Sequence, residues 1–145
     1  MWPVSVERVL TDQAAEIERF VDWGHSTGHS DTLVIASTAS VDAVAGLQAQ
    51  FGADNVSAGV ENFLATAAKR MVDDFGVRRL VVAGGETSGA VLHKLGVRLL
   101  RIGPEICTGV PWTETINSRQ PLALAFKSGN FGDVDFFKRA LEMLA

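Results

Sequence analysis

The sequence has a single cysteine, Cys107, which excludes an internal disulfide and a zinc site built from cysteines. It has no apolar run of membrane-spanning length, and its first residues lack the basic-then-apolar pattern of a signal peptide. An excess of basic residues is also missing. The formal net charge is -4 and the pI is near 5.3, which argues against non-specific binding to nucleic acid. These absences predict a cytoplasmic protein that binds neither membranes nor nucleic acid.

What is present is the composition of a folded domain. Apolar residues make up 47% of the 145 residues and charged residues 21%. A chain of this length can bury a proper core, and no repeat, low-complexity tract or linker divides it. We therefore expect one domain over residues 1–145, in which a helix and a loop over 1–31 lead into a core over 32–145.

Hydrophobic spacing predicts alternating helices and strands. The helices are expected at 5–23, 40–51, 56–75, 88–95 and 133–145. Buried strands are expected at 32–36, 79–83, 97–102 and from 122, with an edge strand around 112–116 because a proline precedes it. This alternation predicts a three-layer α/β/α fold with a mostly parallel, Rossmann-like sheet. In such sheets ligands bind beyond the carboxyl ends of the strands.

The most informative stretch is 80–89, Leu-Val-Val-Ala-Gly-Gly-Glu-Thr-Ser-Gly, where a buried strand meets a helix through Gly84 and Gly85. This order brings backbone N–H groups and a positive helix end to the sheet edge, where anions bind. Thr87 or Ser88 is expected to cap the helix. The spacing matches neither the P-loop nor the G-x-G-x-x-G fingerprint, so a tight connection without a ligand is the alternative.

A second glycine turn lies near the C-terminus, where Lys127-Ser-Gly-Asn-Phe-Gly132 joins a strand-like run to a helix. The lysine ammonium is a compact charge suited to phosphate oxygens. The alternative is a solvated lysine at a strand end. Together the two turns favour a phosphate-bearing ligand, and a nucleotide above others.

Other side chains give weaker signals. Glu105 is placed to reach a metal-bound phosphate or a ribose hydroxyl, and Trp112 either walls an adenine or packs into the core. His25 and His29 have the spacing of helical metal ligands, but the glycines around them predict a loop, so no metal ligand is assigned. No serine, histidine and acid grouping indicates a hydrolytic triad, and no catalytic residue is assigned.

The motifs resemble the C-terminal nucleotide-binding domain of the four-carbon acid sugar kinases, which phosphorylate 3-oxotetronate, threonate or erythronate with ATP. The matching stretches are 83–91, 102–112 and 127–132, followed by 135–137, and the likeness runs from about residue 32 to the end. Three motifs in the family's order are more specific than any one of them.

The resemblance implies that ATP binds at the two turns. The family's nucleotide contacts map onto Gly84, Gly85, Glu86, Thr87 and Gly129, with Ser88, Lys127 and Asn130 as neighbours. It also implies Mg²⁺ alongside the nucleotide, with Glu86 as the carboxylate expected to contact that ion directly or through water.

The resemblance also implies what this chain needs from elsewhere. The family's kinases carry an N-terminal domain that binds the sugar acid, and a strand and Gly-Ser loop that open the nucleotide domain. Neither is found in these 145 residues, so we expect binding of ATP or ADP without catalysis unless a partner chain supplies the missing half. The alternatives are a regulatory module for another phosphorylated ligand and a structural piece that forms homo-oligomers through an unpaired sheet edge.

Overall fold

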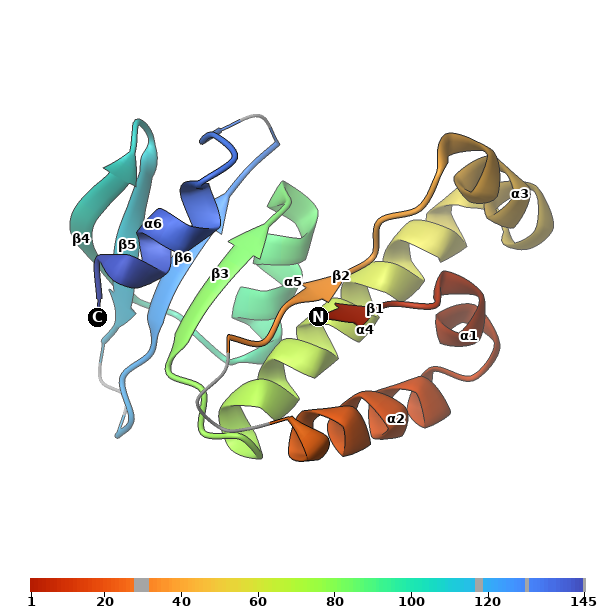
Figure 1. Ribbon diagram of the computed structural model, residues 1–145, viewed down its shortest axis with the longest axis horizontal. Coiled ribbons are helices and arrows are strands. Elements are labelled where there is room, and N and C mark those ends of the chain that lie inside the picture. The colour runs from red at the N-terminus through yellow and green to blue at the C-terminus, as the bar shows by residue number, and fades with distance from the viewer. Residues whose placement is uncertain (28–31, 117–118, 130, 145) are drawn as a thin grey trace. The chain divides into compact units, whose positions relative to one another are not determined.

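A computed structural model describes residues 1–27, 32–116, 119–129 and 131–144 of the chain (Figure 1). The chain divides into two compact units, a first unit of Met1–Phe75 and a second unit of Gly76–Ala145. The first unit contains β1 (Trp2–Pro3), α1 (Val6–Thr11), α2 (Gln13–Ser26), β2 (Ile35–Ala36), α3 (Val41–Phe51) and α4 (Ala53–Asp73). The second unit contains β3 (Arg79–Ala83), α5 (Gly85–Lys94), β4 (Leu100–Cys107), β5 (Val110–Thr115), β6 (Ala123–Lys127) and α6 (Phe136–Glu142).

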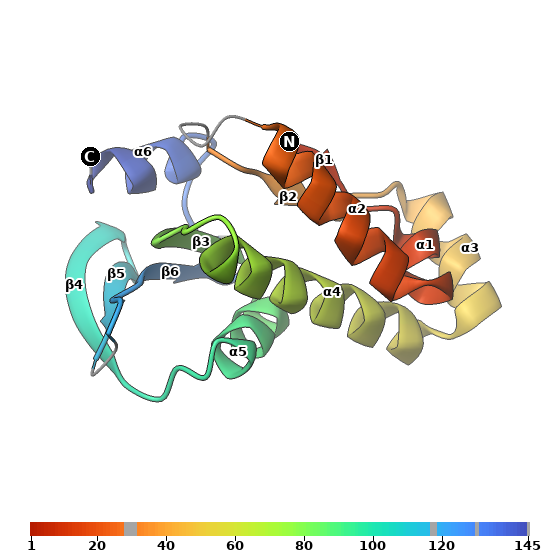
Figure 2. The same ribbon diagram turned by 90° about the horizontal axis from the view of Figure 1, so that it is seen from below.

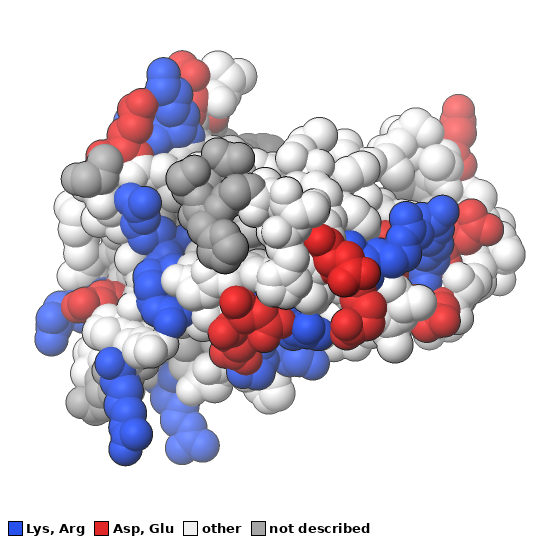
Figure 3. Space-filling model, turned by 60° about the horizontal axis from the view of Figure 1, so that its bottom comes forward, with Lys and Arg blue, Asp and Glu red and all other residues white. Residues whose placement is uncertain are grey.

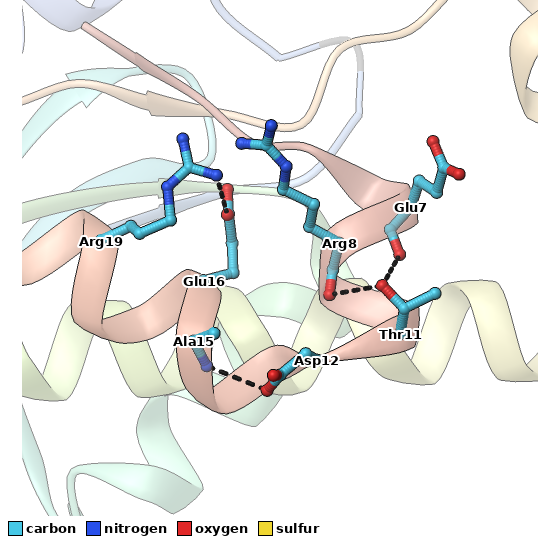
Figure 4. A network of polar contacts seen from close by, with 7 residues as sticks. All are labelled: Glu7, Arg8, Thr11, Asp12, Ala15, Glu16 and Arg19. Atoms are coloured by element: carbon cyan, nitrogen blue, oxygen red, sulfur yellow. Dashed lines mark hydrogen bonds and ion pairs between the residues drawn. The ribbon is translucent and has the colours of Figure 1, made fainter.

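The helix predicted over 5–23 is two helices, because Asp12 interrupts it. The Asp12 carboxylate accepts a hydrogen bond from the Ala15 N–H at 3.1 Å and caps α2 (Figure 4). The loop predicted over 24–31 is wrong in its first part, because α2 continues to Ser26 and includes His25. The His25 ring lies 5.0 Å from the Phe75 ring, and His29 lies outside the described residues.

The first unit packs α1, α2 and α4 around a core centred on Phe20, Phe63 and Ala67, all fully buried. The strand predicted over 32–36 is only the two residues of β2, paired in parallel with β1. Within this unit the carboxylate of Glu16 is buried and pairs with Arg19 at 3.4 Å (Figure 4). Gly52, at φ +85°, separates α3 from α4, as its place after the predicted helix indicates.

The second unit is built on a four-stranded sheet in the order β3-β6-β5-β4. Strands β3 and β6 are parallel, and β5 is antiparallel to both of its neighbours. The strand predicted to be buried at 97–102 is the exposed edge β4, in which Ile102 is 76% exposed. The predicted edge strand is the interior β5. Its Pro111 is tolerated because it pairs with Glu105 between two register shifts of the ladder.

Helices α5 and α6 cover opposite faces of this sheet, which gives the second unit three layers (Figure 2). Helix α5 packs on β3 and β6. The other face presents Val81, Ala125 and Trp112, which are aligned by the strand register, to Phe136 and Ala140 of α6. The α/β class predicted from the sequence is confirmed.

The last helix begins later than predicted, at Phe136 instead of residue 133. Asp133 does not cap it; its carboxylate accepts from the Asp135 N–H at 3.1 Å and pairs with Arg139 at 3.0 Å, which forms a turn ahead of α6. Phe136 and Ala140 are therefore the buried residues. Phe137 is 47% exposed, and Val134 is almost fully exposed.

Acidic and basic side chains are interspersed on the face drawn in Figure 3. On α4, Lys69 pairs with Asp73 at 2.8 Å, and Arg70 pairs with Asp74 and Glu18. These hydrogen bonds to Asp74 and Glu18 raise the pKa of Arg70 above its ordinary value. Exposed pairs of this kind contribute little stability each. Among the described helices, none combines the length and the apolar character needed to cross a bilayer.

Candidate nucleotide-binding site

The two glycine turns begin side by side at one edge of the sheet. Ala83 and Lys127, the last residues of the parallel strands β3 and β6, are register partners. The Gly84 N–H donates a hydrogen bond to the Lys127 carbonyl at 2.8 Å, so the turns are joined at their first step. The shared edge expected for the two turns is therefore present in the structure.

The first turn exposes the start of α5. Gly84 has φ +113°, a conformation that side chains rarely adopt, and Gly85 is the first residue of the helix. The N–H groups of Gly85, Glu86 and Thr87 have no carbonyl partner within α5, since the first turn of any helix leaves such donors unpaired. Outside the chain neighbours of Gly85 and the backbone of its own helix, no described atom lies within 4 Å of the position that its Cβ would take. An anion can therefore approach these donors closely.

The hydroxyl residues of this turn act differently from the prediction. The Ser88 hydroxyl donates to the Gly84 carbonyl at 2.6 Å, and the side chain is buried. Among the described residues, no side chain caps α5, so the expected cap from Thr87 or Ser88 is wrong. Ser88 therefore stabilises the turn from its buried side, whereas Glu86 is exposed and Thr87 is half-buried.

The second glycine turn places one cation, the Lys127 ammonium, beside the first glycine turn. The Lys127 ammonium donates to the Gly129 carbonyl at 2.7 Å and lies 5.9 Å from the centre of the Phe136 ring. Gly129 is exposed, whereas Asn130 lies outside the described residues. The Lys127 side chain thus folds over its own loop. A ligand anion that binds the ammonium replaces its hydrogen bond to the Gly129 carbonyl.

A third loop reaches the same edge through the hairpin between β4 and β5. Since β4 and β6 are both antiparallel to β5, the tip of the hairpin at Gly109 lies at the carboxyl ends of β3 and β6. The Glu105 carboxylate accepts from the Gly109 N–H at 2.8 Å, so it holds this tip. Trp112 is 2% exposed and donates to the Ala140 carbonyl at 2.9 Å, which settles its place in the core.

Sequence reasoning missed Phe131, the aromatic residue that does lie at this edge. Its ring contacts Gly109: a Cβ there would lie 3.1 Å from the Phe131 Cε1 atom. Its place in a glycine-rich loop was the available signal, but its exposure could not be read from the sequence.

The chain itself offers little for a metal ion. In the part of the chain that the structure describes, no group of three or more His, Cys, Asp or Glu side chains could hold one. Shallow hollows of about 400 and 410 Å³ lie elsewhere, one at the opposite end of β5 and one in the first unit around Trp2 and Arg8. The glycine edge is open, with Gly85, Glu86 and Gly129 exposed to solvent.

The family described as "Nucleotide-binding C-terminal domain" matches residues 1–137. The chain belongs to this family. The match begins at residue 1, so this nucleotide-binding C-terminal domain includes residues 1–31, which the motifs alone left outside the resemblance.

The nucleotide-binding C-terminal domain is similar to a 3-oxo-tetronate kinase of Methylobacterium radiotolerans, with 51% identity over 134 residues, 92% of this chain and 31% of that protein. A similar solved structure is that of a Salmonella typhimurium LT2 protein (40% identity, TM-score 0.85, 98% of this chain and 35% of that one). Another is a Haemophilus influenzae protein (34% identity, TM-score 0.87, 99% and 34%). The chain spans 26% to 34% of the length of the curated 3-oxo-tetronate kinases that it matches.

Proposed function

We propose that this chain binds ATP or ADP along the edge formed by its two glycine turns, as the nucleotide-binding part of a four-carbon sugar-acid kinase. The register of Ala83 with Lys127 carries the proposal, because it brings the free N–H groups of α5 and a lysine ammonium to one edge. Both kinds of donor bind phosphate oxygens. The kinase names of the relatives support ATP as the nucleotide.

Each of these backbone and side-chain groups then has a defined role in binding the nucleotide. The N–H groups of Gly85, Glu86 and Thr87 bind phosphate oxygens, and Lys127 exchanges the Gly129 carbonyl for a further one. Mg²⁺ bound with the nucleotide neutralises phosphate charge. Glu86 is exposed at this edge, and its carboxylate would contact the ion directly or through water. A single carboxylate fits such a role, since Mg²⁺ keeps several waters and takes phosphate oxygens as ligands.

Phosphoryl transfer needs groups beyond this chain. Because the chain spans about 30% of the kinases that it matches, we propose that the sugar acid is bound by a separate substrate domain, whether on the same polypeptide or on a partner chain. The 145 residues alone bind nucleotide without transferring phosphate. An ATP-dependent activity of this kind favours the cytoplasm.

A calorimetric titration of the purified chain with Mg-ADP, Mg-ATP and NAD tests this proposal. We expect saturable binding of the two adenine nucleotides and no heat with NAD. Absence of binding by a chain shown to be folded would contradict the proposal. A preference for sugar phosphates would favour a regulatory module, and concentration-dependent oligomers without any ligand response would favour a structural role.

Replacement of Lys127 tests the phosphate contact by itself. Lys127→Ala should weaken ATP by about tenfold and leave adenosine unchanged, because only the phosphates meet the ammonium. Competition titrations measure both ligands. Lys94→Ala, at the other end of α5, is the matched control and should bind both as the unaltered chain does. Equal losses of ATP and adenosine would remove the phosphate role from Lys127.

A further inference from the structure

We propose that Phe131 is the platform on which the adenine base of the bound nucleotide stacks. The inference rests on the proposed function and adds to it the residue that recognises the base. Three observations carry it: the exposure of Phe131, the support of its ring by Gly109, and its position along the sheet edge.

The ring of Phe131 is 47% exposed, whereas Phe20, Phe63 and Phe136 are fully buried in the cores. Its side chain is therefore a surface aromatic. The Phe131 N–H donates to the Ser128 carbonyl at 3.2 Å, which closes the turn that carries the ring. An aromatic ring with an open surface can stack a base of a nucleotide.

Gly109 supports the ring from the hairpin tip. Its φ of +79° is a glycine conformation, and a Cβ at this position would come within 3.1 Å of the Phe131 ring. The Glu105 carboxylate fixes the tip by accepting from the Gly109 N–H. The Phe131 ring thus packs on a hairpin tip that is held by a hydrogen bond. A ring positioned in this way loses less conformational entropy when a base stacks on it.

The order of groups along the edge matches the order of groups in a nucleotide. The sheet order β3-β6-β5-β4 places the N–H groups of α5 first, Lys127 next, and the hairpin tip with Phe131 last. Neighbouring strands are about 4.8 Å apart, so the donors that follow β3 and the hairpin tip that precedes β5 are about two strand spacings apart. Ribose and phosphates bridge a separation of this kind, with the base at the far end.

Neither of the other aromatic candidates takes this place. Trp112 is buried and hydrogen-bonded to α6. Phe137 is as exposed as Phe131, but it lies on α6 with its ring 5.7 Å from the Phe136 ring. Phe137 is therefore the matched control for Phe131.

The test measures the binding of Mg-ADP, adenosine and Mg-pyrophosphate to Phe131→Ala, Phe131→Trp and Phe137→Ala. Phe131→Ala should weaken ADP and adenosine by about tenfold and leave pyrophosphate within about twofold. Phe131→Trp should keep or improve the affinity for ADP, and Phe137→Ala should bind all three ligands as the unaltered chain does. Lys127→Ala should show the opposite pattern, with pyrophosphate weakened and adenosine unchanged.

The outcomes separate this inference from the proposed function. If the unaltered chain binds no adenine nucleotide, both are wrong. If it binds ADP, and Phe131→Ala binds ADP equally well, only the stacking role is wrong. A loss of ADP that is the same in Phe131→Ala and Phe137→Ala, or a parallel loss of pyrophosphate, also overturns it. Thermal melting of each variant confirms that the fold is retained.

Discussion

Gly85→Val should lower the affinity of the chain for Mg-ADP by about 100-fold or more. Gly85 is the first residue of α5, and outside its chain neighbours and its own helix backbone no described atom lies within 4 Å of an added Cβ. The new side chain occupies the open space through which a phosphate reaches the free N–H groups. Calorimetric titration measures the loss, and circular dichroism checks that α5 and the sheet remain folded.

Gly89→Val is the control for this variant. Gly89 lies one turn further along α5, is exposed, and also has no described atom within 4 Å of an added Cβ. This variant makes the same chemical change on the same helix but away from the unpaired donors, so it should bind Mg-ADP normally. Normal binding by Gly85→Val would refute the first turn as a phosphate site. An equal loss in both variants would point to a change in the helix instead.

Trp112→Ala should lower the free energy of unfolding of the second unit by about 3–5 kcal/mol. The side chain is 2% exposed and packs against Ala125 and Phe136, and its Nε1 group donates to the Ala140 carbonyl at 2.9 Å. Truncation leaves a cavity between β5 and α6 and an unpaired carbonyl. Hydrogen exchange of the β5 and β6 amides measures the change in this unit alone.

Trp112→Phe separates packing from hydrogen bonding, because it keeps most of the apolar surface and removes only the donor. We expect a smaller loss of about 1–3 kcal/mol from the buried Ala140 carbonyl. Trp23→Phe, in the first unit, should leave the exchange of β5 and β6 unchanged. If Trp112→Ala kept its stability and lost ADP affinity, Trp112 would be a ligand contact and its core role would be wrong.

Local patterns predicted the strand–turn–helix segment well. The apolar run 79–83 is β3, and the glycine pair ends it, because both signals depend only on neighbouring residues. The prediction placed β5 at the edge of the sheet and β4 inside it, whereas the structure has the reverse. This could not be predicted, since a bulge opposite Pro111 removes the usual conflict of proline with an interior strand. Where the strands lie in the sheet depends on pairings between distant residues.

The candidate site was predicted unevenly for a similar reason. The two turns were found from glycine and lysine positions, and the parallel register joins them. The hydrogen-bond partners of individual side chains could not be predicted from the sequence. The Ser88 hydroxyl donates to the Gly84 carbonyl, and the Glu105 carboxylate accepts from the Gly109 N–H at the hairpin tip. Similarly, Asp12 and Asp133 redirect helix starts by accepting local N–H groups, which apolar periodicity does not register.

The pairing of β3 with β6 also has a consequence for the order of folding. Helix α5 and the whole β4–β5 hairpin lie between these two strands in the chain, so their pairing closes the longest loop in the sheet. The hairpin and β6 can assemble from near neighbours first, and β3 joins last. The Gly84–Lys127 hydrogen bond therefore forms late and is among the first to open in local unfolding. A nucleotide that contacts both turns would slow this opening, and the β3 amides would then show the largest slowing of hydrogen exchange on binding.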